Sequence, residues 1–313
     1  MGLFGKATKK GLEAGYTHKH ILQSEHLALA AELGDAFGGN DDFEELRPKE
    51  LMRVAVAKHD AGWIAADAKM TLDAGTMLPR NLLFSPPGTG LEVVPESVRL
   101  AQQAAGHSLY VGLMVSMHHV GLQKRRFNMG GGKIPALTEM AKEKERLTGE
   151  SSRAASAGDA EANERMLAEM TEFQAGVVKT FSEAGSADEK EWVSHDRLWS
   201  NYKALQFFDT LSLYFCLAPP EERTELTCKK VPVNATDDAD VVVTPVPESA
   251  AAACNSEANA YSVSPYPFNR SPLTVHMEGV FIKPADGDPE RLTTMDVRAA
   301  GEAHVETITL VRG

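Results

Sequence analysis

Residues 207–215 read FFDTLSLYF and set one acidic side chain, Asp209, inside an apolar helical pattern that runs from Trp192 to Phe215. Burying a carboxylate there costs several kcal/mol unless a cation or strong hydrogen-bond donors compensate it. A metal ion is one such compensation. Gln206 lies three residues earlier on the same helix face. We therefore count Gln206 as a candidate catalytic residue that can hold a ligand or a metal-bound water.

A second acid stands beside a histidine in KHDAGW, residues 58–63. Pro48 opens the predicted helix that carries His59 and Asp60, and this helix ends by about Ala68. Adjacent helical side chains point roughly 100° apart, so the pair can reach one point only if that face packs against other helices. Metal binding is the functional interpretation. The alternative is a surface histidine satisfied by the acid beside it, which the dipeptide alone favours.

Three further histidines lie in helical patterns. His26 falls in a predicted helix that begins near Ile21, where an isolated histidine is more often a packed or capping residue. His118 and His119 end an apolar helical pattern that runs from Pro95. His107 precedes His118 by three turns, which places them roughly 16 Å apart on a continuous helix. His107 is therefore expected to be structural, and His118 is the better metal ligand.

The fold class predicted from these patterns is mainly α. Residues 1 to about 20 are expected to form a loosely held arm, and a capping box at Ser186 is expected to start the last long helix. After Pro219 the chain changes to Val/Thr-rich segments, at 241–244, 273–276 and 306–310, which are typical of short strands. We predict a helical metal-binding domain, residues 1–218, with a small β-rich segment, residues 219–313, packed on it.

Composition and charge limit the functional classes. The chain has 313 residues, of which 43% are hydrophobic, and a net charge of −12, the wrong sign for a nucleic acid or an anionic membrane as partner. No run approaches the roughly 20 apolar residues of a membrane span, and no signal peptide is evident, so we expect a cytoplasmic protein. The three cysteines, Cys216, Cys228 and Cys254, are too scattered for a disulfide framework or a zinc–thiolate site.

The order of the polar residues, His26, then His59-Asp60, then a distant Asp209, resembles the HD superfamily of helical metal-dependent phosphohydrolases. The resemblance implies an HD-domain-like helical bundle that holds one or two divalent ions (Fe, Mn or Zn). The predicted metal ligands are His26, His59, Asp60, His118 and Asp209. Many HD enzymes have a lysine after the glycine that follows His-Asp, whereas Trp63 follows Gly62 here. An indole cannot replace that cation in handling phosphate.

A second resemblance covers almost the whole chain. The sequence is similar to the DUF3891 family of uncharacterised bacterial proteins. It rests on the segments SEHLALA (24–30), HDAGW (59–63), VSMH (115–118), LQFFDTLSL (205–213) and PYPF (265–268). No activity comes with that family, so the resemblance implies an architecture and not a reaction.

Three functions remain as hypotheses. The first is a metal-dependent hydrolase, with a phosphoester among its expected substrates. In it His118 or His119 donates a proton to the leaving group, and Lys124 to Arg126 help with charge. The basic segment is more often a solvated helix end whose charges suit the helix dipole. The second is a di-iron oxygenase of a small polar substrate, which the missing lysine favours. The third is a non-catalytic binding protein with a satisfied polar core. The expected partner is a small molecule, including anionic ones, with no nucleic acid and no membrane, and the oligomeric state is left open.

Overall fold

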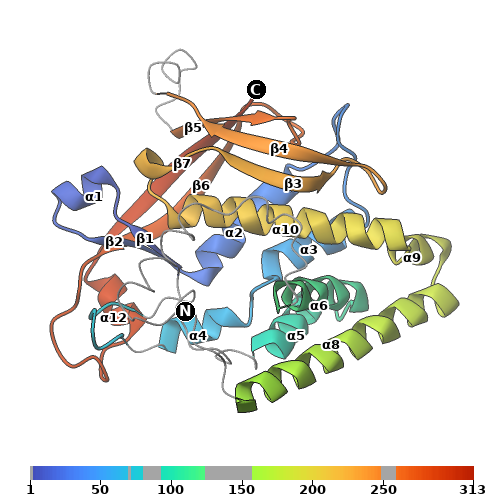
Figure 1. Ribbon diagram of the computed structural model, residues 1–313, viewed down its shortest axis with the longest axis horizontal. Coiled ribbons are helices and arrows are strands. Elements are labelled where there is room, and N and C mark those ends of the chain that lie inside the picture. Colours follow the sequence, from blue (N-terminus) through green and yellow to red (C-terminus); the bar gives the residue numbers. More distant parts are fainter. Residues whose placement is uncertain (1–2, 70–71, 80–92, 124–156, 248–258) are drawn as a thin grey trace.

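The computed structural model describes residues 3–69, 72–79, 93–123, 157–247 and 259–313. Its centre is one long helix, α10 (His195–Leu217), whose residues from Ser200 onward are nearly all buried. A mixed sheet packs on one side of α10, and further helices pack on the other (Figure 1). The apolar stretch 207–215 therefore lies between two layers, which explains why it carries so little polar character.

The sheet contains seven strands in the order β1-β2-β6-β7-β5-β4-β3. Their bounds are β1 Leu3–Lys6, β2 His18–Ile21, β3 Leu226–Pro232, β4 Asp238–Pro245, β5 Asn259–Ser264, β6 Leu273–Ile282 and β7 Glu302–Arg312. All neighbours are antiparallel except β5 and β7, which are parallel. Along the first part of β6, Leu273, Val275 and Met277 are buried and alternate with exposed residues, as a sheet with one covered face requires.

The helices have the bounds α1 Lys9–Glu13, α2 Gln23–Asp35, α3 Lys49–Lys58, α4 Trp63–Lys69, α5 Val93–Ala104, α6 Leu109–Gln123, α8 Ala157–Ala184, α9 Ala187–Trp192 and α12 Thr294–Ala299. A 3₁₀ turn, η2, spans Pro220–Glu222. Helix α2 packs on α10, α3 and β6, while α6 packs on α3, α5 and α8. Four helices that are distant in sequence, α2, α3, α6 and α10, thus meet in one region of the molecule (Figure 1).

The predicted mainly α, HD-like bundle with a small β segment is wrong. The strands after residue 219 form as predicted, but they belong to a seven-stranded sheet that also takes β1 and β2 from the N-terminal arm. Lys19 of β2 pairs with Phe281 of β6 across the expected division at residue 218. The N-terminal strands have four residues each, too short to show a period of two, and form because β6 offers an open edge.

Two predicted long helices are each divided in two. The helix from Pro95 to His119 breaks between α5 and α6, where His107 has a φ of 68° in an exposed turn. The capping box at Ser186 is present, with Glu189 N–H donating to Ser186 Oγ at 3.3 Å, but it starts only α9. A second helix, α10, then begins after Ser194. Apolar periodicity continues across both breaks, because both halves pack on the same core.

The helix predicted from Pro48 to Ala68 also breaks, and the break carries His59 and Asp60. Helix α3 ends at Lys58, and α4 starts at Trp63. Gly62 makes the turn possible: its N–H donates to Ser97 Oγ at 2.9 Å, and a Cβ there would lie 2.4 Å from the Val93 carbonyl oxygen. The contact with α5 therefore holds the His-Asp pair in a turn and not in a regular helix.

Substituting Gly62→Ala is expected to lower the free energy of unfolding by about 1–3 kcal/mol, because the added methyl forces α5 away from the turn. Gly176→Ala is the matched control, since Gly176 lies within α8 with no atom within 4 Å of an added Cβ. In Gly176→Ala the free energy of unfolding should rise by about 0.5–1 kcal/mol, because alanine has the higher helix propensity. Urea unfolding followed by circular dichroism measures both. Equal changes in the two variants would contradict the close packing at Gly62.

Three charged side chains are buried between α10 and the sheet, and we call them the buried ion cluster: Lys19 of β2, Arg223 and Glu306 of β7. Arg223 binds the Glu306 carboxylate through both terminal nitrogens and donates to the Phe215 carbonyl at 2.7 Å. Lys19 Nζ lies 3.5 Å from Glu306 Oε2. Two cations therefore share one carboxylate in the interior.

Candidate metal centre

His26 comes from α2 and Asp209 from α10, and their side chains meet. Nε2 of His26 lies 3.3 Å from Oδ1 of Asp209. The other ring nitrogen, Nδ1, lies 3.1 Å from Ser212 Oγ, and that hydroxyl donates its only proton to the Asp209 carbonyl at 2.9 Å. Nδ1 of His26 must therefore be the donor to Ser212. In the neutral ring, the lone pair of Nε2 then faces the Asp209 carboxylate.

His59 is oriented in the same way at the end of α3. Its Nδ1 lies 2.7 Å from the Val56 carbonyl oxygen, which can only accept, so Nδ1 carries a proton. Nε2 of His59 lies 3.3 Å from Nε2 of His26 and 3.5 Å from Oδ1 of Asp209. When both rings are neutral, two imidazole lone pairs and one carboxylate oxygen converge. We call His26, His59 and Asp209 the first donor set.

The carboxylate and the histidines of the first donor set shift each other's pKa. Burial lowers the pKa of His59, but the Asp209 and Asp60 carboxylates outweigh it and raise that pKa to about 9. Burial raises the pKa of Asp209, but its contacts with His26 and His59 hold it well below the usual range of a carboxyl. In the protein without metal, a proton on His59 balances the buried carboxylate. A divalent ion can take that place and release the proton.

Asp60 lies beside the first donor set with two more histidines. Its Oδ1 is 3.6 Å from Nε2 of His118 and 3.7 Å from Nε2 of His119. In the part of the chain that the structure describes, this buried oxygen accepts no hydrogen bond. His59, Asp60 and His118 can offer ligand atoms that lie within 4.8 Å of one another. We call these three residues the second donor set.

His119 differs from the other histidines of this region. Its Nε2 lies 3.0 Å from the His59 carbonyl oxygen and donates to it, which uses the nitrogen nearest Asp60. Burial, followed by the nearby His118, lowers the pKa of His119 to about 4, so the ring is neutral at physiological pH. A neutral His119 holds the backbone of the His-Asp turn in place.

The structure brings together all five predicted metal ligands, which are buried or nearly so, with Asp60 the most accessible at 9%. Two chemical observations fit a divalent ion. The histidine and carboxylate atoms are the donors that such ions prefer, and Ser212 and Val56 orient the two rings as partners of ligating histidines commonly do. Metal ligation itself stays a prediction. His107 lies outside the centre, and Lys124 to Arg126 lie outside the described residues.

Ser212 is the residue of this centre that sequence patterns do not identify. A serine within FFDTLSLYF is unremarkable, because a helical serine commonly bonds to a carbonyl of the preceding turn. The one sequence feature that points to Ser212 is its spacing of three residues from Asp209, which places both side chains on one helix face. Gln206, which was singled out from the sequence, does reach the centre: its Nε2 lies 2.9 Å from Nδ1 of His118.

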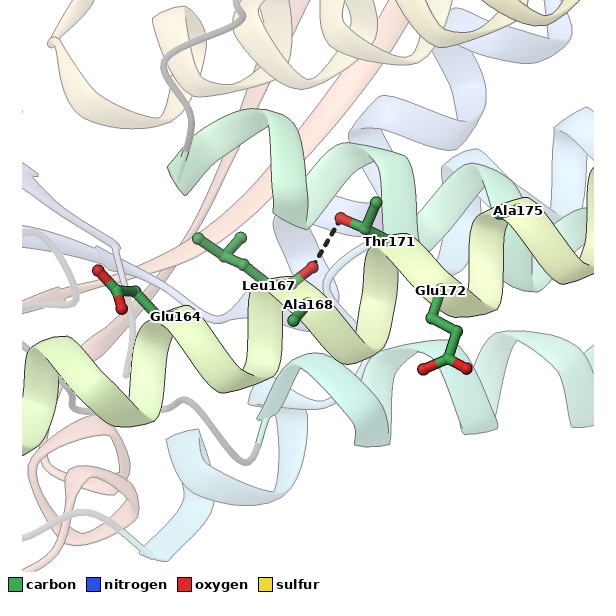
Figure 2. A pocket seen from close by; sticks show the side chains of 6 residues that line it. All are labelled: Glu164, Leu167, Ala168, Thr171, Glu172 and Ala175. Atoms are coloured by element: carbon green, nitrogen blue, oxygen red, sulfur yellow. Dashed lines mark hydrogen bonds between the residues drawn. The ribbon is translucent and has the colours of Figure 1, made fainter.

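A hollow on the surface of α8 is separate from the metal centre. Figure 2 shows it lined by six side chains of that one helix, Glu164, Leu167, Ala168, Thr171, Glu172 and Ala175. Thr171 donates to the Leu167 carbonyl at 2.7 Å and so belongs to the helix's own bonding. The hollow holds none of the histidines or aspartates described above.

Within the described residues, no helix combines the length and the apolar character that crossing a membrane requires. Neither the curated proteins nor the solved structures contain a match to the chain. One family does match, over residues 13–284, and it is described as "protein of unknown function (DUF3891)". The match includes the helices and turns that carry the five predicted ligands. This match confirms the resemblance to DUF3891 that the sequence segments indicated, and the chain belongs to the DUF3891 family.

Proposed function

We propose that this protein is a metal-dependent hydrolase that acts on a small molecule. The observation that carries the proposal is the convergence of the first donor set, in which the Nε2 atoms of His26 and His59 and Oδ1 of Asp209 lie 3.3–3.5 Å from one another. Three protein ligands leave coordination positions open, as in catalytic metal sites. A divalent ion bound there supplies Lewis acidity and lowers the pKa of a coordinated water.

The residues beside the first donor set suit proton transfer. Asp60 has one oxygen free of hydrogen bonds in the described structure. Burial raises the pKa of Asp60, but its contact with His118 outweighs burial and holds that pKa well below the usual range, so the carboxylate stays ionised and can orient a water or a substrate hydroxyl. His118, 3.6 Å away, can donate a proton to the leaving group. Asp60 is also the most accessible of the five residues, which makes it the side from which a small substrate would enter.

A second candidate function is an iron-dependent oxygenase. The specific observation that favours it is the composition of the first donor set, two histidines and one carboxylate, which is the ligand set of many non-haem Fe(II) oxygenases. The second donor set leaves room for another ion, as a di-iron enzyme needs. The hydrolase takes precedence because Asp60 can orient a water and His118 can donate a proton, and hydrolysis needs no added reductant.

Elemental analysis of protein purified without chelator or nickel affinity resin tests the proposal first. We expect bound Zn, Mn or Fe in the wild type and its loss in His26→Ala, with His195→Ala as control because His195 is exposed. Hydrolysis of nitrophenyl esters and phosphoesters by the metal-loaded wild type would support a hydrolase. Oxygen uptake by the Fe²⁺-loaded protein would support the second candidate. Metal-free wild type that cannot be loaded would refute both.

A further inference from the structure

The carboxamide of Gln206 and the ring of His118 form a buried pair between α10 and α6. Nε2 of Gln206 lies 2.9 Å from Nδ1 of His118. An amide nitrogen can only donate, so Nδ1 of His118 accepts this bond. In a neutral ring the proton is then on Nε2, the atom that lies 3.6 Å from Oδ1 of Asp60. His118 is held in the form that donates a proton toward Asp60.

This form of His118 cannot bind a metal. Its Nε2 carries a proton, and the lone pair of Nδ1 is taken by Gln206. To serve in the second donor set, His118 must move its proton to Nδ1 and offer Nε2, and the proton on Nδ1 then needs an acceptor. Gln206 holds such an acceptor, because its Oε1 is buried and bonds to no group of the described structure.

Rotation of the Gln206 carboxamide by half a turn exchanges the two forms. It replaces the bond from Gln206 Nε2 to His118 Nδ1 by a bond from His118 Nδ1 to Gln206 Oε1. Since Oε1 has no other partner to lose, the rotation breaks one hydrogen bond and makes one. In the metal-free protein the contact of His118 Nε2–H with Asp60 favours the first orientation, and a cation near Nε2 can select the second.

We propose that Gln206 is a positioning residue that sets whether His118 acts as a proton donor to Asp60 or as a ligand of a second divalent ion. A first ion would be held by Nε2 of His59, because Nδ1 of His59 is committed to the Val56 carbonyl, and a second ion would then take its protein ligands from Asp60 and His118. This inference rests on the proposed function, in that the first donor set must bind an ion. It adds that one side chain, Gln206, controls whether the centre binds one divalent ion or two.

The test uses full-length protein with ¹⁵N-labelled histidine, treated with chelator, and long-range ¹H–¹⁵N correlation spectra that report which nitrogen of His118 carries the proton. In the wild type without metal we expect the proton on Nε2, and after addition of Zn²⁺ beyond one equivalent we expect it on Nδ1. Gln206→Glu presents only acceptors, so its His118 should carry a proton on Nδ1 before Zn²⁺ is added. Its second Zn²⁺ should bind about 10–100-fold more tightly than in the wild type.

Two further variants make the outcome specific. Gln206→Leu offers neither donor nor acceptor and should leave His118 without a fixed tautomer. Gln174→Glu adds the same charge on α8 and should behave as the wild type. A Gln206→Glu protein with the His118 tautomer and second Zn²⁺ affinity of the wild type would overturn this inference alone, provided that the first Zn²⁺ still binds. Wild type that binds no Zn²⁺ would overturn the proposed function and this inference together.

Discussion

The variant Asp209→Asn is expected to bind Zn²⁺ at least about a hundredfold more weakly than the wild type. Loss of a partner that only orients a ligand costs about 10–100-fold, and loss of the ligand itself costs more. Asparagine keeps the size of the side chain and removes the charge that balances His26 and His59. Titration calorimetry of chelator-treated protein with Zn²⁺ measures the affinity, and circular dichroism shows whether the fold is retained.

The matched control is Asp196→Asn, because Asp196 is an exposed acid in the first turn of the same helix. It should bind Zn²⁺ as the wild type does. Thermal melts add a second readout: a chelator should lower the melting temperature of metal-loaded wild type and leave Asp209→Asn unchanged. Equal chelator effects on the two proteins, or none on either, would mean that Asp209 is a structural carboxylate and would remove it from the metal centre.

The second large effect concerns the buried ion cluster. Glu306→Gln is expected to lower the free energy of unfolding by about 3–5 kcal/mol, because it leaves Lys19 and Arg223 without the carboxylate that they share. Lys19→Met should be neutral or stabilising by about 1–4 kcal/mol, since it removes the unbalanced second cation. The double variant should be more stable than Glu306→Gln alone. Urea unfolding at neutral pH measures all three.

The pH dependence of stability provides an independent check of the same cluster. Burial lowers the pKa of Lys19 from 10.5 to about 8, against the opposing effect of Glu306. Between these two values the unfolded chain binds more protons than the folded one, so Lys19 makes the free energy of unfolding rise with pH from about 8 to 10.5. Lys19→Met should lose that contribution. A variant that keeps the full slope would show that Lys19 does not titrate in this way.

The candidate metal centre was predictable in part because each proposed ligand stands out against the apolar residues around it in the sequence. Asp209 within FFDTLSLYF, and His59 with Asp60 after an apolar run, are polar groups where burial is costly, and that cost is visible from one segment at a time. Five such residues indicate a shared partner without indicating how they are arranged. The orienting contacts of Ser212 and the Val56 carbonyl need the local geometry of each helix turn.

The amino-acid pattern alone indicates which segments are apolar enough to be buried, that Asp209 needs a compensating charge, that strands follow residue 219 and that the chain resembles DUF3891. The pairing of β1 and β2 with β6 depends on tertiary contacts, since a four-residue strand is stabilised by its neighbour and not by its own pattern. Tertiary packing also breaks the helix at His59 to Gly62, because the contact of α5 with Gly62 joins segments that are far apart in the sequence. The break at His107 is a local turn, in which His107 has a positive φ and its N–H donates to the Gln102 carbonyl. Those breaks place His59, Asp60 and His118 around one point, which no single periodicity can specify.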